Sequence, residues 1–90
     1  MAKEEIVKEI SLATGIEQNA VVKVIDQFMS TVKETIAEGH PVTLRGFGTF
    51  AIRTRAERMG RNISKGESVL IPSHKVVKFI PSKDFRDIVK

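Results

Sequence analysis

Residues 46–62 of this 90-residue chain have the sequence GFGTFAIRTRAERMGRN, and this stretch decides the fold. Two glycines flank Phe47 in a predicted tight turn, because glycine tolerates backbone conformations that other residues avoid. The strand that follows is predicted to extend to about Met59, and it begins with Phe50 and Ile52 on one face. Its later half loses this apolar alternation and gains arginines. The stretch therefore predicts a strand that starts in a core and continues into solvent.

A second long strand is predicted over residues 68–80, and a short strand over 42–45 precedes the glycine turn. Pro72 has no N–H to donate, so we expect an edge or a bulge at that position. We interpret residues 53–60 and 65–75, which lack core-forming alternation, as the two strands of a ribbon that projects from the body. A disordered basic loop is the alternative, and an arm that orders only on DNA would combine the two.

Helices are predicted over residues 3–14 and 18–38, where apolar side chains recur at intervals of three and four. The apolar stripe of the second helix spans roughly 160°, whereas an ordinary surface helix needs little more than about 100°. This excess suggests packing against more than one neighbour, as in a dimer interface. A short last helix is predicted over 83–89, capped by Ser82 and anchored in part by Ile88.

Charge is divided unevenly along the chain, whose formal net charge is +4. The first 44 residues contain four lysines and seven acidic side chains, whereas residues 45–90 contain eleven lysines and arginines and four acidic side chains. A basic half of this kind predicts a polyanionic partner, and nucleic acid is the favoured one. A merely solvated charged surface is the alternative.

Several classes of function find little support in the composition. The chain has no cysteine, so it has neither disulfides nor thiolate metal sites, and its first ten residues carry charges where a signal peptide needs an apolar core. No run of about 18 apolar residues predicts a membrane span. His40 and His74 lack neighbours at metal-ligand spacing, and no Walker-type phosphate loop is present. We therefore expect an intracellular, non-enzymatic protein of one domain, with no catalytic residue, metal, cofactor, membrane contact or small-molecule substrate.

Two helices joined by a short glycine-containing turn also describe a sequence-specific helix-turn-helix transcription regulator, which is the main alternative function. Its recognition helix needs exposed basic residues, but helix 18–38 offers only Lys23 and Lys33 against three acidic side chains. A single-strand binder would need exposed aromatic side chains, and the chain has neither Trp nor Tyr. A protein-interaction module with an acidic partner is a further alternative.

An ordered set of motifs extends over essentially the whole chain. It comprises GFGTF at 46–50, Arg53, Arg55, Arg58, GRN at 60–62, Gly66, Glu67, Ile71, Pro72, Phe79 and Lys83. On these residues the chain resembles the HU/IHF family of bacterial histone-like proteins. The resemblance implies an α+β fold, in which a helical base and a small antiparallel sheet extended into a long β-ribbon arm form an intertwined dimer. Residues 1–39 would be the helical dimerisation part, 40–82 the sheet and DNA-binding arm, and 83–90 the C-terminal helix.

The resemblance also implies a function. The protein would bind the minor groove of double-stranded DNA with its arms, bend the duplex and help compact the bacterial chromosome with little sequence specificity. It would do so in the cytoplasm, on the nucleoid. It would act as a homodimer, and a heterodimer with a paralogue is the other pairing that the resemblance allows.

Site residues follow from the resemblance position by position. The implied DNA-binding residues are Lys3, Arg53, Arg55, Arg58, Arg61, Asn62, Ile63, Lys65, Lys75, Lys78 and Lys83. The implied dimer core consists of Val21, Ile25, Phe28, Val32, Phe47, Phe50 and Phe79.

The predicted arm tip has the sequence GRNISKGE at 60–67, where Ile63 is the one large apolar residue. A β-branched side chain is stiff and would suit a wedge between two base pairs, whereas local packing on the arm is the alternative. Members of the family usually carry proline at this point, in a GRNP sequence, so this chain departs from the family pattern. We expect Ile63 to be the intercalating wedge, because isoleucine is itself a side-chain type that unstacks base pairs.

Overall fold

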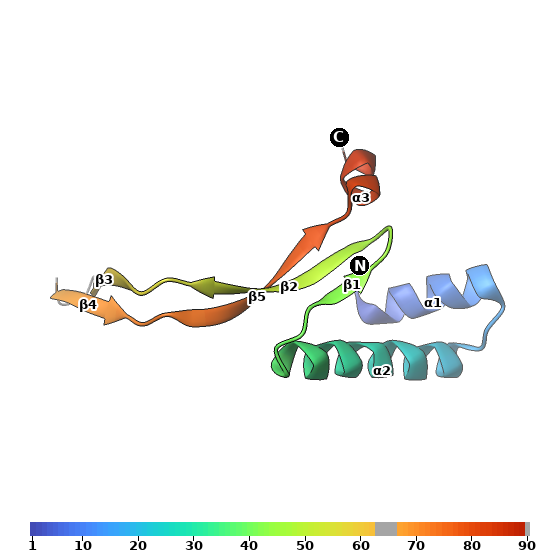
Figure 1. Cartoon of the computed structure of the whole chain (residues 1–90). Coiled ribbons are helices and arrows are strands. Elements are labelled where there is room, and N and C mark those ends of the chain that lie inside the picture. The colour runs from blue at the N-terminus through green and yellow to red at the C-terminus, as the bar shows by residue number, and fades with distance from the viewer. Residues whose placement is uncertain (63–66, 90) are drawn as a thin grey trace. The chain divides into compact units, whose positions relative to one another are not determined.

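The computed structural model describes residues 1–62 and 67–89, which form helices and antiparallel strands, as the predicted α+β class requires (Figure 1). In chain order the elements are α1 (Lys3–Thr14), α2 (Gln18–Ala37), β1 (Val42–Leu44), β2 (Gly48–Arg55), β3 (Arg58–Asn62), β4 (Glu67–Ile71), β5 (His74–Pro81) and α3 (Lys83–Ile88). The chain forms two compact units, residues 1–35 and 36–90. The second unit contains the whole sheet and the arm.

Helix α1 ends where the sequence predicts, because Gly15 adopts a left-handed conformation with φ of 75°. The backbone N–H of Gly15 donates to the carbonyl oxygen of Ser11 at 2.9 Å, and the Ser11 hydroxyl donates to the carbonyl oxygen of Ile16 at 2.6 Å. The connection to α2 is therefore short and hydrogen-bonded, and it turns the chain back on itself.

The two helices of the first unit are joined by an ion pair between Lys3 Nζ and Asp26 Oδ1 at 2.9 Å. Each helix contributes one buried apolar side chain, Val7 from α1 and Val21 from α2. Helix α2 ends at Ala37, one residue before the predicted end, since the following residues already form a turn.

The sheet of the second unit has the strand order β1-β2-β5, and both pairings are antiparallel. The predicted glycine turn joins β1 to β2. Gly46 has a φ of 81°, and the backbone N–H of Phe47 donates to the carbonyl oxygen of Leu44 at 2.9 Å. The carbonyl oxygen of Phe47 also accepts from the backbone N–H of Ser82 at 2.9 Å, which ties this turn to the start of α3.

Four phenylalanines pack together at this end of the sheet. The ring centroid of Phe79 lies 5.2 Å from that of Phe47 and 5.1 Å from that of Phe50, its partner on β2. The ring of Phe85 lies 5.3 Å from Phe47. These spacings and tilts are the ones that aromatic pairs favour. Gly48 makes the cluster possible, because a Cβ at that position would lie 2.5 Å from Phe79 Cζ.

Helix α3 begins as predicted, with the Ser82 hydroxyl accepting from the backbone N–H of Phe85 at 3.2 Å. The expectation that Ile88 anchors this helix is wrong, because its side chain is 82% exposed. The helix has only six residues, and Ile88 occupies its last position, beyond the aromatic cluster that Phe85 reaches.

The ribbon interpretation of the arm is confirmed for the described residues, with one difference from the sequence prediction. Each predicted long strand is interrupted, at residues 56–57 between β2 and β3 and at residues 72–73 between β4 and β5. Arg55 pairs with His74 before the interruption and Arg58 with Ile71 after it, so the register continues unchanged. Pro72 explains the interruption, because it has no backbone N–H to donate to the opposite strand. The residues beside it and opposite it are therefore left without strand partners.

Within the described residues 1–62 and 67–89, none of the helices combines the length and the apolar character needed to cross a bilayer.

The Gly48→Ala substitution is expected to lower the free energy of unfolding by roughly 2 kcal/mol, the order of magnitude for an overpacked core position. The added methyl group would meet both Phe79 Cζ at 2.5 Å and the backbone carbonyl oxygen of Ile80 at 2.6 Å. The backbone oxygen cannot move away without breaking the pairing of β5. Thermal or urea unfolding at a fixed protein concentration measures the loss.

The same substitution at Gly60 is the control. There the added methyl would meet the Cδ1 atom of Ile71 at 2.6 Å, which is the end of a side chain that can rotate away. We expect Gly60→Ala to cost clearly less than Gly48→Ala. Equal losses would show that the backbone contact at Gly48 does not hold the aromatic cluster in place.

Candidate nucleic-acid interface

The register of β2 and β5 separates an aromatic face of the sheet from a basic face. Directly paired residues of an antiparallel sheet lie on the same face, and successive residues alternate between faces. Phe50, Ile52 and Thr54 therefore share one face with Phe79, Val77 and Lys75. Ala51, Arg53 and Arg55 share the other face with Lys78, Val76 and His74.

This arrangement places the two predicted DNA-binding residues of β5 on different faces of the sheet. Lys78 pairs with Ala51 and lies on the basic face with Arg53 and Arg55. Lys75 pairs with Thr54 and lies on the aromatic face. The sequence alone did not distinguish the two lysines, because the distinction depends on which residues of β2 they oppose.

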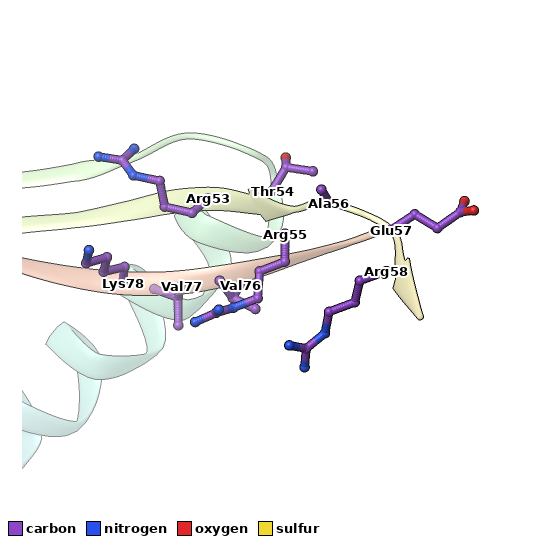
Figure 2. A pocket seen from close by; sticks show the side chains of 9 residues that line it. All are labelled: Arg53, Thr54, Arg55, Ala56, Glu57, Arg58, Val76, Val77 and Lys78. Atoms are coloured by element: carbon purple, nitrogen blue, oxygen red, sulfur yellow. The ribbon is translucent and has the colours of Figure 1, made fainter. Parts of the chain in front are cut away.

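A hollow of about 680 Å³ lies on the part of the chain where β2 and β5 give way to the arm (Figure 2). Its lining residues are Arg53, Thr54, Arg55, Ala56, Glu57, Arg58, Val76, Val77 and Lys78. The structure thus brings together four of the predicted DNA-binding side chains around one concave surface.

Figure 2 shows the Arg55 and Arg58 side chains extending toward the same side, while the Glu57 carboxylate points away from them. The three arginines and Lys78 are all exposed. Guanidinium groups keep their charge and can make two parallel hydrogen bonds to a phosphate. The hollow is therefore suited to the oxygen atoms of a nucleic-acid backbone.

His74 is a member of the basic face that the sequence analysis did not include among the site residues. It is the direct partner of Arg55, and its Nδ1 atom lies 3.2 Å from the carbonyl oxygen of Pro72. This contact places the imidazole at the interruption of the arm. The position of His74 in the sequence does not indicate that it belongs with the arginines, because only the pairing of β2 with β5 brings it beside Arg55.

The outer part of the arm is the ribbon of β3 and β4. Arg61 and Asn62 belong to β3, where they pair with Ser68 and Glu67. The predicted wedge Ile63 and the predicted DNA contact Lys65 lie outside the described residues.

The predicted DNA-binding residues outside the arm, Lys3 and Lys83, lie in different units. Lys3 belongs to α1, where its ammonium group is paired with Asp26, and both side chains remain about half exposed. An exposed ion pair of this kind contributes only about 0–1 kcal/mol, so it does not prevent Lys3 from meeting a phosphate. Lys83 is exposed and is the first residue of α3.

In the part of the chain that the structure describes, no three histidine or acidic side chains are grouped so that they could hold a metal ion.

Comparison with known proteins gives matches along the whole chain. The family described as "Bacterial DNA-binding protein" matches residues 1–90. DNA-binding protein HU of Geobacillus stearothermophilus is 37% identical over 90 residues, which are 100% of both chains. DNA-binding protein HU-beta of Salmonella typhimurium is 36% identical over 89 residues, which are 99% of each chain.

A solved structure is similar over the same extent. The Anabaena HU–DNA cocrystal structure superposes with a TM-score of 0.94 at 34% sequence identity, and the alignment covers 99% of this chain and 97% of that chain. The sequence motifs, the ribbon with its basic root and the full-length matches agree, and the chain belongs to the family of bacterial DNA-binding proteins that contains HU.

Proposed function

We propose that this protein is an architectural protein that binds double-stranded DNA through its basic arm, bends it and contributes to compaction of the chromosome. The observation that carries the proposal is the basic face, where Arg53, Arg55 and Lys78 line one hollow with Arg58 at the root of a β-ribbon. The ribbon is a shape that enters a DNA groove, and the cations match its phosphate walls.

Binding of this kind is expected to depend on charge more than on base sequence. Each phosphate neutralised by an arginine or lysine releases condensed counterions, which favours binding at low salt. The minor groove distinguishes little beyond A·T from G·C pairs, so the sequence preference is modest. Deformable base steps are favoured over stiff A-tracts because bending them costs less energy.

The bend is proposed to come from Ile63 at the tip of the arm. An apolar side chain that enters between two base pairs unstacks them at a cost of a few kcal/mol, and the kink allows more of the protein to reach phosphates. The proposal rests on the position of Ile63 in the GRNI sequence and on its residue type.

The active form is proposed to be a dimer, because a single chain leaves much of its apolar surface exposed. Among the described residues only Val7, Val21 and Ala51 are buried apolar side chains. Phe28 of α2 and Phe47 of the turn are 44% and 46% exposed. A chain this short needs a further source of stability, and burial of these aromatic side chains against a second copy provides it.

The dimer core would extend along α2. Beside the exposed Phe28, an open groove of about 450 Å³ is lined by Lys23, Val24, Gln27 and Thr31. Ile25 and Val32 are half-buried. Phe47, Phe50 and Phe79 of the sheet would complete the core. We propose the homodimer as the working form in the cytoplasm, on the nucleoid, without catalytic activity or a bound cofactor.

The architectural function is preferred to a helix-turn-helix regulator for a specific reason. The predicted recognition helix, α2, presents Val24 and Phe28 to solvent rather than a basic surface. Such a helix suits a protein interface better than a DNA groove.

One prediction of the proposed function concerns the dimer. Sedimentation equilibrium should give a mass of twice 10.0 kDa for the wild-type protein. Phe28→Asp should raise the dimer dissociation constant by roughly 100-fold or more, because it replaces a core aromatic side chain with a charge. Leu12→Asp on α1 is the control, since Leu12 is exposed and is not in the proposed core. A Phe28→Asp protein with wild-type mass and stability would contradict the proposed interface.

Another prediction concerns the arginines. Arg55→Gln should reduce the slope of log affinity against log salt by about 0.9 for each phosphate contact that it removes. Fluorescence anisotropy with a short duplex over a series of salt concentrations measures this slope. Lys33→Gln, on α2 and outside the basic face, should leave the slope unchanged. If both variants change it equally, general charge rather than the basic face determines affinity.

A further prediction concerns bending. Wild-type protein should raise fluorescence energy transfer between dyes at the two ends of a short duplex, because the bend brings the ends together. Ile63→Ala should still bind, but it should lose most of this increase. Ile88→Ala, which removes an exposed isoleucine of α3, should behave as the wild type. Equal bending by all three proteins would assign the bend to the basic arms alone, and binding without bending by the wild type would favour the helix-turn-helix function.

A further inference from the structure

The outer part of the arm carries an exposed apolar pair that the proposed phosphate contacts and wedge do not use. Met59 of β3 and Leu70 of β4 are direct partners across the ribbon, so they lie on the same face. Their exposed fractions are 64% and 58%. Single exposed apolar residues are common on protein surfaces, but two large ones in direct apposition on a narrow ribbon form a continuous apolar strip.

This pair is not the packing that holds the ribbon together. On the opposite face, Gly60 pairs with Val69, and the Cδ1 atom of Ile71 lies where a Gly60 side chain would be. Ile71 is half-buried as a result. Ile71 thus covers the backbone at Gly60, and the neighbouring Val69 is 42% exposed. Met59 and Leu70 lie on the other face and are the more exposed pair.

The charges around the pair determine what can cover it. Arg58 directly precedes Met59 and therefore lies on the opposite face of the ribbon, and the basic face with Arg53, Arg55 and Lys78 lies further along the same arm. A second arm of the same charge would be repelled from this surface. An occupant that offers anionic groups beside an apolar surface is favoured by both features.

The minor groove of DNA has this chemistry. Its walls carry phosphates on the outside and the C–H surfaces of deoxyribose rings between the phosphates and the base edges. A ribbon in the groove would place arginines at the phosphates and an apolar side chain against the sugars. Proteins that bind the minor groove commonly bring apolar side chains to it.

We propose that Met59 and Leu70 pack against deoxyribose in the minor groove and supply a part of the binding free energy that does not depend on salt. The inference rests on the proposed function, because it requires the arm to enter the groove. It assigns to the outer arm a second mode of contact, separate from counterion release by the arginines and from the wedge at Ile63.

The test is the double variant Met59→Gln/Leu70→Thr, which keeps the length of the side chain at residue 59 and the strand-forming ability at residue 70 but removes the apolar strip. Its affinity for a short duplex should fall about tenfold, as expected when apolar area of this order is no longer removed from water. The fall should be the same at every salt concentration, because no counterion is released at this contact. The plot of log affinity against log salt is therefore displaced with an unchanged slope, whereas Arg55→Gln changes the slope.

Two further variants act as controls. The swap Met59→Leu/Leu70→Met keeps an apolar strip of nearly the same area, and it should bind as the wild type does. Leu12→Thr removes an exposed leucine, 74% exposed, from α1, and it should also leave affinity unchanged. Circular dichroism and the unfolding transition of each variant show whether the fold is intact.

Four outcomes would overturn the inference. The first is a double variant with wild-type affinity. The second is a double variant whose salt slope falls as that of Arg55→Gln does, since that result would assign the effect to charge. The third is a swap variant as weak as the polar one. The fourth combines two results. Sedimentation velocity without DNA shows that the wild type associates beyond the dimer and that the double variant does not, while the two proteins bind DNA with equal affinity. Failure of the wild type to bind the duplex would instead refute the proposed function.

Discussion

The contact of the Phe79 ring with the backbone at Gly48 is the constraint on which the rest of the second unit depends. It is possible only because residue 48 has no side chain, and it brings Phe79 against both Phe47 and Phe50. This cluster fixes β5 against β2 in one register. A slip of one residue would exchange the two faces of a strand and move Lys78 to the aromatic side. The position of the basic face therefore follows from aromatic packing at the other end of the same two strands.

The two strands serve packing and binding at once because their side chains alternate. One face of β2 and β5 carries Phe50 and Phe79, and the other carries Arg53 and Arg55. Charged groups on the second face need no buried partner, since they remain in solvent until a phosphate arrives. Stability and the proposed DNA contacts thus depend on different residues of the same pair of strands.

Sequence reasoning succeeded where a local signal determines the structure. Gly15 ends α1 and Ser82 begins α3, and both were found because helix ends have characteristic residues. The glycine turn, the basic arm and the effect of Pro72 also follow from residue types at single positions.

The parts that could not be predicted depend on pairing between distant residues. The interruption at residues 56–57 has no proline of its own and arises because that segment lies opposite Pro72. The separation of Lys75 from Lys78, the place of His74 beside Arg55 and the ion pair of Lys3 with Asp26 likewise require the tertiary structure. Ile88 follows Phe85 at the spacing of one helix face, but α3 ends at Ile88 and its side chain is exposed rather than packed in a core.

The unchanged register across the interruption has a consequence for how the arm meets DNA. Because Arg55 and Arg58 keep their alignment with β5 and β4, cations continue from the sheet into the ribbon without a shift in register. Coulomb attraction acts over roughly 8 Å at physiological salt, whereas apolar contact requires direct apposition. The arginines at the root can therefore attract the duplex before any apolar side chain touches it. In the proposed complex, the apolar pair of the outer arm and Ile63 would contribute only once the duplex is bound, so their loss would affect dissociation more than association.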